Sequence, residues 1–203
     1  MEFVAGCCSP RERYFLGLTL VDQRARRLLP GARAPELEYW RNVMAAEATD
    51  ALEMLKDDHR QVEALFKEYE QLAGGEDIAA KEVVATEICE KLTVHAQLEE
   101  EVFYPAARQV LDKQEIIDEA EEEHADAKQL IAELEEMSPE DDAYDTTVKS
   151  LSDAIAHHVE EEESEMFPKL KEAGMETEAV GEQMAERRQE IMDELGLAET
   201  EEE

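Results

Sequence analysis

Cysteine is scarce in this chain of 203 residues, and its scarcity excludes two classes of small protein. Only three cysteines occur, two of them adjacent at Cys7 and Cys8 and the third alone at Cys89. Their spacing supports neither a disulfide framework nor a cysteine-based zinc site, so the reducing cytoplasm is the expected location. Long apolar runs are also lacking: no stretch reaches the ~18 residues expected of a membrane-spanning helix.

Basic residues are few as well. The chain has 20 Lys and Arg against 54 Asp and Glu, which gives a net charge of -34. Because phosphate groups are bound by positive charge, we expect no nucleic-acid partner and no anionic membrane surface as a partner. The same excess of acid attracts cations, favours solubility, or suits a saline cytoplasm. The charge alone does not choose among these three explanations.

The excess of acid begins only after residue 43. Residues 1–43 hold seven Arg against five acidic residues, whereas residues 44–203 hold 13 basic and 49 acidic residues and all the histidines. We therefore expect residues 1–46 to be an N-terminal extension, either poorly ordered or translated from upstream sequence. The folded part is then a domain over residues 47–172, followed by a C-terminal helix and an acidic tail over residues 173–203.

Apolar residues recur every three or four positions from about residue 47 onward, which predicts helices and no strands. The first helix is expected to end at 73–75, and the second to be kinked or ended by Pro105. Ser138 and Pro139 offer an N-cap and a first helical position, so the fourth helix is expected to begin there and to end near Pro168. The sequence thus predicts an all-α fold: an up-down-up-down four-helix bundle with an extra C-terminal helix.

One histidine falls on the apolar stripe of each of the four predicted helices, and a Glu follows two of these histidines by four positions. The six residues are His59, His95, Glu99, His124, His158 and Glu162. The segment HAQLEEEVFYP, which starts at His95, returns as HVEEEESEMFP, which starts at His158. The segments DDHRQVEALFKE and EEHADAKQLIAE align in the same way, so the chain reads as a duplicated pair of helices.

This combination of side chains favours a bound metal. A His and a Glu four positions apart lie on one helix face, about 6 Å apart along the axis, and can share one ion. Burying four imidazoles and two carboxylates without a partner would cost several kcal/mol for each charged group. Imidazole and carboxylate suit Fe, Zn, Mn or Cu, and six ligands exceed what one tetrahedral ion needs. Two carboxylates able to bridge therefore indicate a two-metal centre with open positions.

The order H…HxxxE…H…HxxxE, with VFYP and MFP after the second and fourth helices, resembles the hemerythrin HHE cation-binding family over roughly residues 47–170. That resemblance implies a non-haem di-iron centre, with two irons per chain and oxo or hydroxo and carboxylate bridges. By the same resemblance, the four histidines are terminal iron ligands, and Glu99 and Glu162 are the bridging carboxylates.

Two departures from the oxygen-carrying hemerythrins weaken the case for simple oxygen carriage. Those proteins have a second His one turn after the third-helix His, where this chain has Lys128. They also place an Asp five residues beyond the fourth-helix His, where this chain has Glu163, although Glu162 fits the internal repeat better. A further ligand is open among Glu121, Glu161 and water.

Several residues near these motifs have ordinary structural explanations. His157 lies one position off the stripe, which favours a surface or outer role, and Tyr69 and Tyr104 are expected to pack in the core. Glu121 and His124 form an ExxH motif like that of ferritin-like bundles. That fold needs a second copy, and the sequence has none.

Three functions follow from these observations. The first is a protein that binds or senses O2, NO or iron, with a small diatomic or peroxide ligand and, in the sensing case, a separate protein partner. The second is an enzyme that removes peroxide or NO, or repairs iron centres. The third is a helical protein whose His cluster binds structural zinc. Turnover of added peroxide or NO would separate the second from the first, and a colourless zinc protein would indicate the third.

Overall fold

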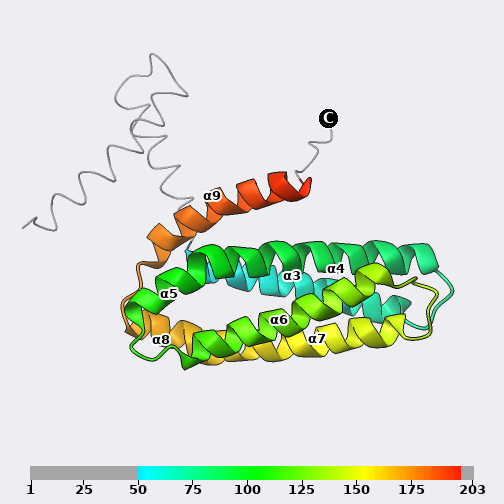
Figure 1. Ribbon diagram of the computed structural model, residues 1–203, viewed down its shortest axis with the longest axis horizontal. Coiled ribbons are helices and arrows are strands. Elements are labelled where there is room, and N and C mark those ends of the chain that lie inside the picture. Colours follow the sequence, from blue (N-terminus) through cyan, green and yellow to red (C-terminus); the bar gives the residue numbers. More distant parts are fainter. Residues whose placement is uncertain (1–49, 198–203) are drawn as a thin grey trace, which may run out of the picture. The chain divides into compact units, whose positions relative to one another are not determined.

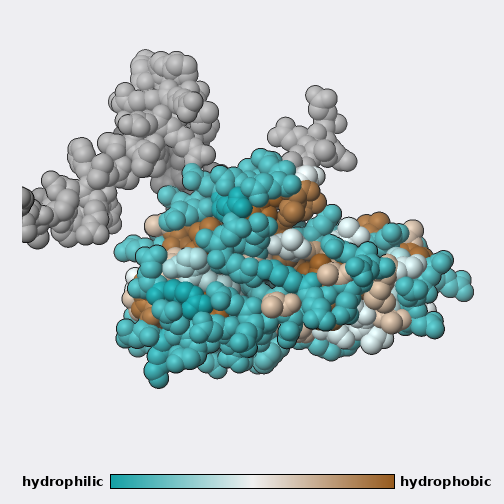
Figure 2. All heavy atoms as spheres, viewed as in Figure 1, coloured by the Kyte–Doolittle hydropathy of each residue, from teal (hydrophilic) through white to brown (hydrophobic). Residues whose placement is uncertain are grey.

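The computed structural model describes residues 50–197, and all the regular secondary structure in this range is helical. The predicted N-terminal extension and the acidic tail after residue 197 lie outside the described residues. Within the described range no helix is both long and apolar enough to cross a membrane. The viewed face in Figure 2 is mostly hydrophilic, as the large excess of acidic residues requires.

Two helical hairpins form the bundle (Figure 1). The first pairs α3 (Ala51–Leu72) with α4 (Ile78–Leu98), and the second pairs α6 (Glu115–Glu136) with α7 (Tyr144–Glu161). Asp50 caps α3 by accepting from the backbone N–H groups of Leu52 and Glu53. Beyond Leu72 the chain turns through Gly74, whose φ of 72° is the left-handed conformation that glycine adopts most readily. The expected all-α bundle of antiparallel helices is confirmed.

Each hairpin's second helix contains one wide π-helical turn. These turns are η1 (Glu99–Phe103) and η2 (Glu162–Met166), and each begins at a predicted bridging Glu. Pro105 and Pro168 follow, where a regular helix would lose an N–H and be crowded by the proline ring. The wider turn before each proline lets the helix continue as α5 (Tyr104–Val110) and α8 (Phe167–Glu172). Of the two outcomes predicted at Pro105, a kink or an end, the end is therefore wrong, and the fourth helix runs on past Pro168 to Glu172.

The fourth helix also begins later than its sequence signal predicts. Ser138 and Asp141 bond to each other's backbone, because the Ser138 N–H donates to the Asp141 carboxylate and the Asp141 N–H donates to the Ser138 carbonyl. These local bonds close a turn instead of capping a helix. The helix α7 begins at Tyr144, whose ring is buried against the core.

The extra helix α9 (Thr177–Leu195) packs along α3, α4 and η1. It buries Val180, Met184 and Ile191, and apolar side chains are visible along the boundary between α9 and the helices beneath it (Figure 2). Thr177 donates to the Asp50 carboxylate, so the start of α9 is tied to the cap of α3. The predicted extra C-terminal helix is thus a packed part of the bundle.

A partly buried ion pair holds the loop end of the bundle. The Nζ atom of Lys81 on α4 lies 2.9 and 2.8 Å from the two carboxylate oxygens of Asp145 on α7. Asp145 also accepts from the Tyr69 hydroxyl and the Gly74 N–H, at 2.8 and 2.9 Å. One carboxylate therefore joins three helical elements and the first loop.

Candidate metal centre

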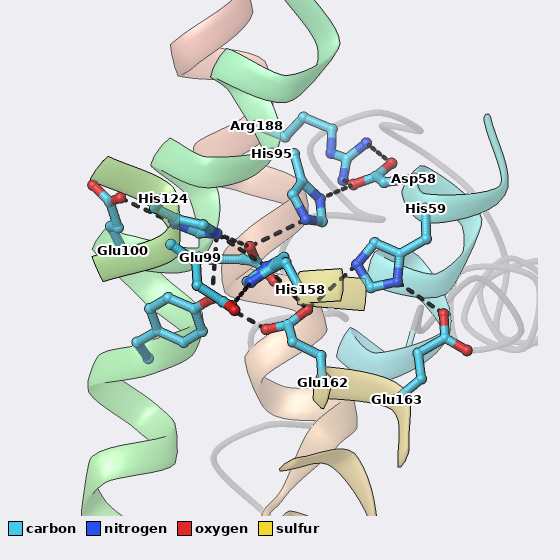
Figure 3. Close-up of polar contacts among 12 residues, drawn as sticks. Asp58, His59, His95, Glu99, Glu100, His124, His158, Glu162, Glu163 and Arg188 are labelled. Carbon is cyan, nitrogen blue, oxygen red and sulfur yellow. Dashed lines mark hydrogen bonds and ion pairs between the residues drawn. The ribbon is translucent and has the colours of Figure 1, made fainter. Parts of the chain in front are cut away.

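All six residues predicted as metal ligands converge at one place inside the bundle (Figure 3). Each is at most 6% exposed, although all six are ionisable. The helical period of 3.6 explains the convergence, because each residue lies on the inward stripe of its helix. The structure thus brings together His59, His95, Glu99, His124, His158 and Glu162.

The ligand atoms form two groups that share a carboxylate. His59, His95, Glu99 and Glu162 make the first group, and Glu99, His124 and His158 make the second. Within each group, the ligand atoms all lie within 4.8 Å of one another. The Glu99 Oε2 atom lies 3.1 Å from His95 Nε2 and 3.3 Å from His124 Nε2, so it faces both groups.

Glu162 has the matching position on the other hairpin. Its Oε2 atom lies 3.3 Å from His59 Nε2 and 3.6 Å from His158 Nε2. Each Glu thus lies between a His of its own hairpin and a His of the other, as a bridging role for both carboxylates requires. The tertiary structure repeats the symmetry of the internal sequence duplication.

Several atoms in this cluster are buried with no hydrogen-bond partner outside the cluster, and this observation tests whether the residues fit a metal. They are His59 Nε2, both carboxylate oxygens of Glu99, and Glu162 Oε2. An orphaned buried carboxylate oxygen is costly in a protein that binds nothing there. These donor atoms face one another across distances that a cation would span, and imidazole with carboxylate suits a divalent transition metal. The six residues therefore fit a bound divalent metal.

A second set of carboxylates holds the outer nitrogens of the four rings. In each ring the Nδ1 atom faces an acidic residue: His59 faces Glu163 at 2.8 Å, His95 faces Asp58 at 3.4 Å, His124 faces Glu100 at 3.1 Å and His158 faces Glu123 at 2.9 Å. Because a carboxylate only accepts, it favours the proton on Nδ1 and leaves Nε2 free for a metal.

The outer acids and the histidines that they face follow the same order in the two hairpins. Asp58 and Glu123, which precede the first His of each hairpin, face the second His of the same hairpin. Glu100 and Glu163, which follow the Glu predicted to bridge, face the first His of the opposite hairpin. Sequence reasoning missed Asp58, Glu100 and Glu123, and it raised Glu163 only as an alternative metal ligand, although the adjacency of these acids to the ligands in both repeats was a usable signal.

The electrostatics of the metal-free site follow from this crowding. Burial lowers the pKa of His95, but the Glu99 and Asp58 carboxylates outweigh burial and raise it to about 10. Burial likewise raises the pKa of Glu99, yet the imidazoles of His95 and His124 hold it well below its usual range. A metal that binds His95 must therefore displace a proton.

Tyr104 is a further residue of the site. Its side chain is fully buried, and its hydroxyl donates to Glu162 Oε1 at 3.1 Å and lies 3.4 Å from His124 Nε2. Burial and the nearby Glu99 and Glu162 carboxylates raise its pKa well above the usual value. Tyr104 does pack in the core as expected, and in addition its hydroxyl, which follows η1, reaches the predicted ligand set. Tyr69 lies elsewhere, against Asp145.

Other residues that the sequence raised stay outside the cluster. Lys128 contacts both oxygens of Glu100 at 2.6 Å and so supports the acid behind His124. Glu121 pairs with Arg108, and His157 is 63% exposed beside Glu123 and Glu161. His157 is exposed, as the expected surface or outer role requires, and the structure does not place Glu121 with the predicted ligands.

A small cavity adjoins the imidazoles on the side away from Tyr104. The volume open to the centre of a water-sized sphere is about 20 Å³, and one water needs ~10–15 Å³. The lining includes all four site histidines and apolar side chains from the four bundle helices, Val62, Leu92, Ala127, Ile131 and Ile155. The cavity therefore has room for a very small molecule beside the ligand set.

The fold and the site together define a helical protein with a cation-binding His and Glu cluster. Residues 50–170 match the hemerythrin HHE cation binding domain, and the chain belongs to that family. A hemerythrin HHE cation binding domain-containing protein of Mycobacterium kansasii has the same fold, with a TM-score of 0.61. It is 23% identical, and the alignment covers 72% of this chain and 89% of that one.

One curated relative has a different name. A DNA nickase of Nostoc sp. is 31% identical over 122 residues. The alignment covers 59% of this chain but only 33% of the nickase, so this chain matches about a third of that protein. The family and the cluster together support a metal-binding helical protein.

Proposed function

We propose that this chain is a non-haem di-iron protein that binds or senses O2, NO or iron through the centre built on Glu99 and Glu162. One observation carries the proposal: two groups of buried ligands share Glu99. A structural zinc site would need one closed tetrahedral group and no shared carboxylate. Two irons, when bound, supply a pair of ions that can cycle between the ferrous and ferric states.

The chain's own residues have separate tasks in this proposal. The four imidazoles and two carboxylates hold the metals, and the four outer acids fix the ring orientation. The cavity of about 20 Å³ would admit a diatomic molecule, and its lining combines the four histidines with apolar side chains. The Tyr104 hydroxyl donates to Glu162 and so steadies one bridging carboxylate.

Metal analysis with an ultraviolet–visible spectrum tests the centre. Protein from iron-supplied cells is expected to carry about two irons per chain, one for each ligand group, and to show charge-transfer bands in the near ultraviolet. The variant His158→Ala should lose the metal of one group, and Glu99→Ala should lose both. His157→Ala is the matched control, since His157 is a surface neighbour of His158. Equal iron in all three variants would overturn the ligand assignment.

The alternative is an enzyme that removes peroxide or NO, or repairs iron centres, at the same site. The buried Tyr104 hydroxyl favours it, because it is a proton donor beside a bridging carboxylate. Catalytic loss of added peroxide or NO over many turnovers would establish this function. Binding of one equivalent without turnover would support the carrier or sensor. A colourless protein with one zinc would support the structural alternative.

The name of the Nostoc relative raises DNA nicking as a separate question. We propose no nucleic-acid activity for this chain, because its net charge of -34 repels a phosphate backbone. The metal-loaded protein is expected to leave supercoiled plasmid intact at low salt. Metal-dependent nicking that disappears in Glu99→Ala would refute this expectation.

A further inference from the structure

Arg188 on α9 contacts the acidic residue behind one predicted metal ligand. Its guanidinium donates to both oxygens of Asp58, with 2.8 Å between Nη1 and Oδ1. The Asp58 Oδ2 atom also accepts from His95 Nδ1 at 3.4 Å. Figure 3 shows the Asp58 carboxylate contacting both the Arg188 guanidinium and the His95 ring.

This arrangement differs from those behind the other histidines. Glu100, which faces His124, is held by Lys128 on α6, whereas Glu123, which faces His158, otherwise contacts only the exposed surface residue His157 among the pairs described. Arg188 belongs to α9, which begins after the part of the chain that matches the family, residues 50–170. Arg188 therefore comes from outside the four bundle helices, whereas Lys128 lies on one of them.

The contact is largely enclosed. The Asp58 side chain is 12% exposed and that of Arg188 is 28% exposed, while the Arg188 Nε atom is buried. A guanidinium that donates to both carboxylate oxygens fixes the plane of the carboxylate, which a single point charge does not. The plane of Asp58 in turn sets the direction from which His95 Nδ1 must donate, and hence where Nε2 points.

We propose that Arg188 is a positioning residue for the metal held by His95, acting through Asp58. This inference rests on the proposed metal centre, and it makes α9 a working part of that centre. Loss of the guanidinium leaves Asp58 free to turn toward the groove between α4 and α9, which Asp58 and Arg188 both line. His95 then loses its fixed acceptor, and the metal ion at that group is held less tightly.

The predicted effect is confined to one of the two metals. Replacing an outer partner of a metal ligand typically costs ~10–100-fold in metal affinity. Because Arg188 contacts Asp58 and not His95 itself, we expect Arg188→Gln to weaken metal binding at the group of His59 and His95 by at most that factor and to leave binding at the group of His124 and His158 unchanged. Arg188→Lys should restore part of the affinity, because lysine keeps the charge but lacks the paired donors.

The control is the neighbouring residue Arg187. It pairs with Glu101 in η1 and with Glu190 and Glu194 on α9, and it has no contact with Asp58. Arg187→Gln changes the charge of the same helix by the same amount and removes another attachment of α9 to the bundle. A metal loss caused only by loosening α9 would appear in both variants.

The experiment is a stepwise titration of the metal-free full-length chain with Co²⁺. Calorimetry and the visible spectrum of the bound ion measure the affinity of each binding step. Iron-57 Mössbauer spectra of the loaded proteins would report each iron's surroundings separately. The inference requires that Arg188→Gln weaken one binding step and shift one iron signal, while Arg187→Gln matches the wild type. Unchanged binding in Arg188→Gln, or equal losses in both variants, would overturn it. Failure of the wild type to bind two ions would instead overturn the proposed function.

Discussion

The ion pair of Lys81 and Asp145 offers a test of the fold that leaves the metal centre untouched. Lys81 is nearly enclosed, with its side chain 6% exposed, whereas that of Asp145 is 32% exposed. Lys81 lies about 21 Å along α4 from His95, at ~1.5 Å per residue. Substitutions there should therefore change stability without changing metal content.

Replacing Lys81 and replacing Asp145 should not destabilise the protein equally, because the two residues differ in burial and in their other contacts. In Lys81→Met, Asp145 keeps its bonds from Tyr69 and Gly74 and can take up water, so we expect a cost of about 1–2 kcal/mol. In Asp145→Ala, a buried ammonium loses its counter-ion, and the Tyr69 hydroxyl and Gly74 N–H lose their acceptor. That change should cost about 3–5 kcal/mol.

The double variant is the sharpest part of this prediction. When Lys81 has been replaced by Met, removing Asp145 leaves no buried ammonium without a counter-ion. The double variant should therefore lose at least ~1 kcal/mol less unfolding free energy than the two single variants added together. Urea unfolding followed by far-ultraviolet circular dichroism measures all three. Lys67→Met is the control, because its pair with Glu63 is exposed and should contribute less than ~1 kcal/mol. Equal single costs, or additive ones, would refute the reasoning.

Three further predictions concern the site and the pH response. Tyr104→Phe should keep both metals but shift the charge-transfer spectrum, because Glu162 loses the hydroxyl that donates to it; an unchanged spectrum would argue against that contact. Metal removal by a chelator should lower the melting temperature of the wild type and of His157→Ala alike, but should leave that of Glu99→Ala unchanged if this variant already lacks metal. Burial raises the pKa of Asp145, but Lys81, Gly74 and Tyr69 together hold it below its usual value. The ionised Asp145 carboxylate therefore stabilises the fold above pH ~4, and this stabilisation is lost as pH falls through the lowered pKa. The difference in unfolding free energy between wild type and Asp145→Asn should thus narrow on acidification. A difference that widens in acid would contradict this sign.

The sequence determined the helices and the inner ligands, because both depend on local spacing. A residue every 3.6 positions lies on one helix face, so four histidines on four apolar stripes had to point into one core. The matched HxxxE motifs placed Glu99 and Glu162 beside their rings for the same reason. The internal repeat fixed the order of the two hairpins without any knowledge of their packing.

Tertiary structure alone decided which partners the rings acquired from other helices. Glu163 reaches His59, and Arg188 reaches Asp58, across more than a hundred residues of chain, and no local period encodes either contact. The π turns also escaped sequence reasoning, because proline predicts a break unless the surrounding bundle holds the helix on its course. With that turn in place, Tyr104 reaches the site instead of only the core. Such contacts depend on how whole helices pack, and packing sums many weak distant interactions that neighbouring residues in the sequence do not reveal.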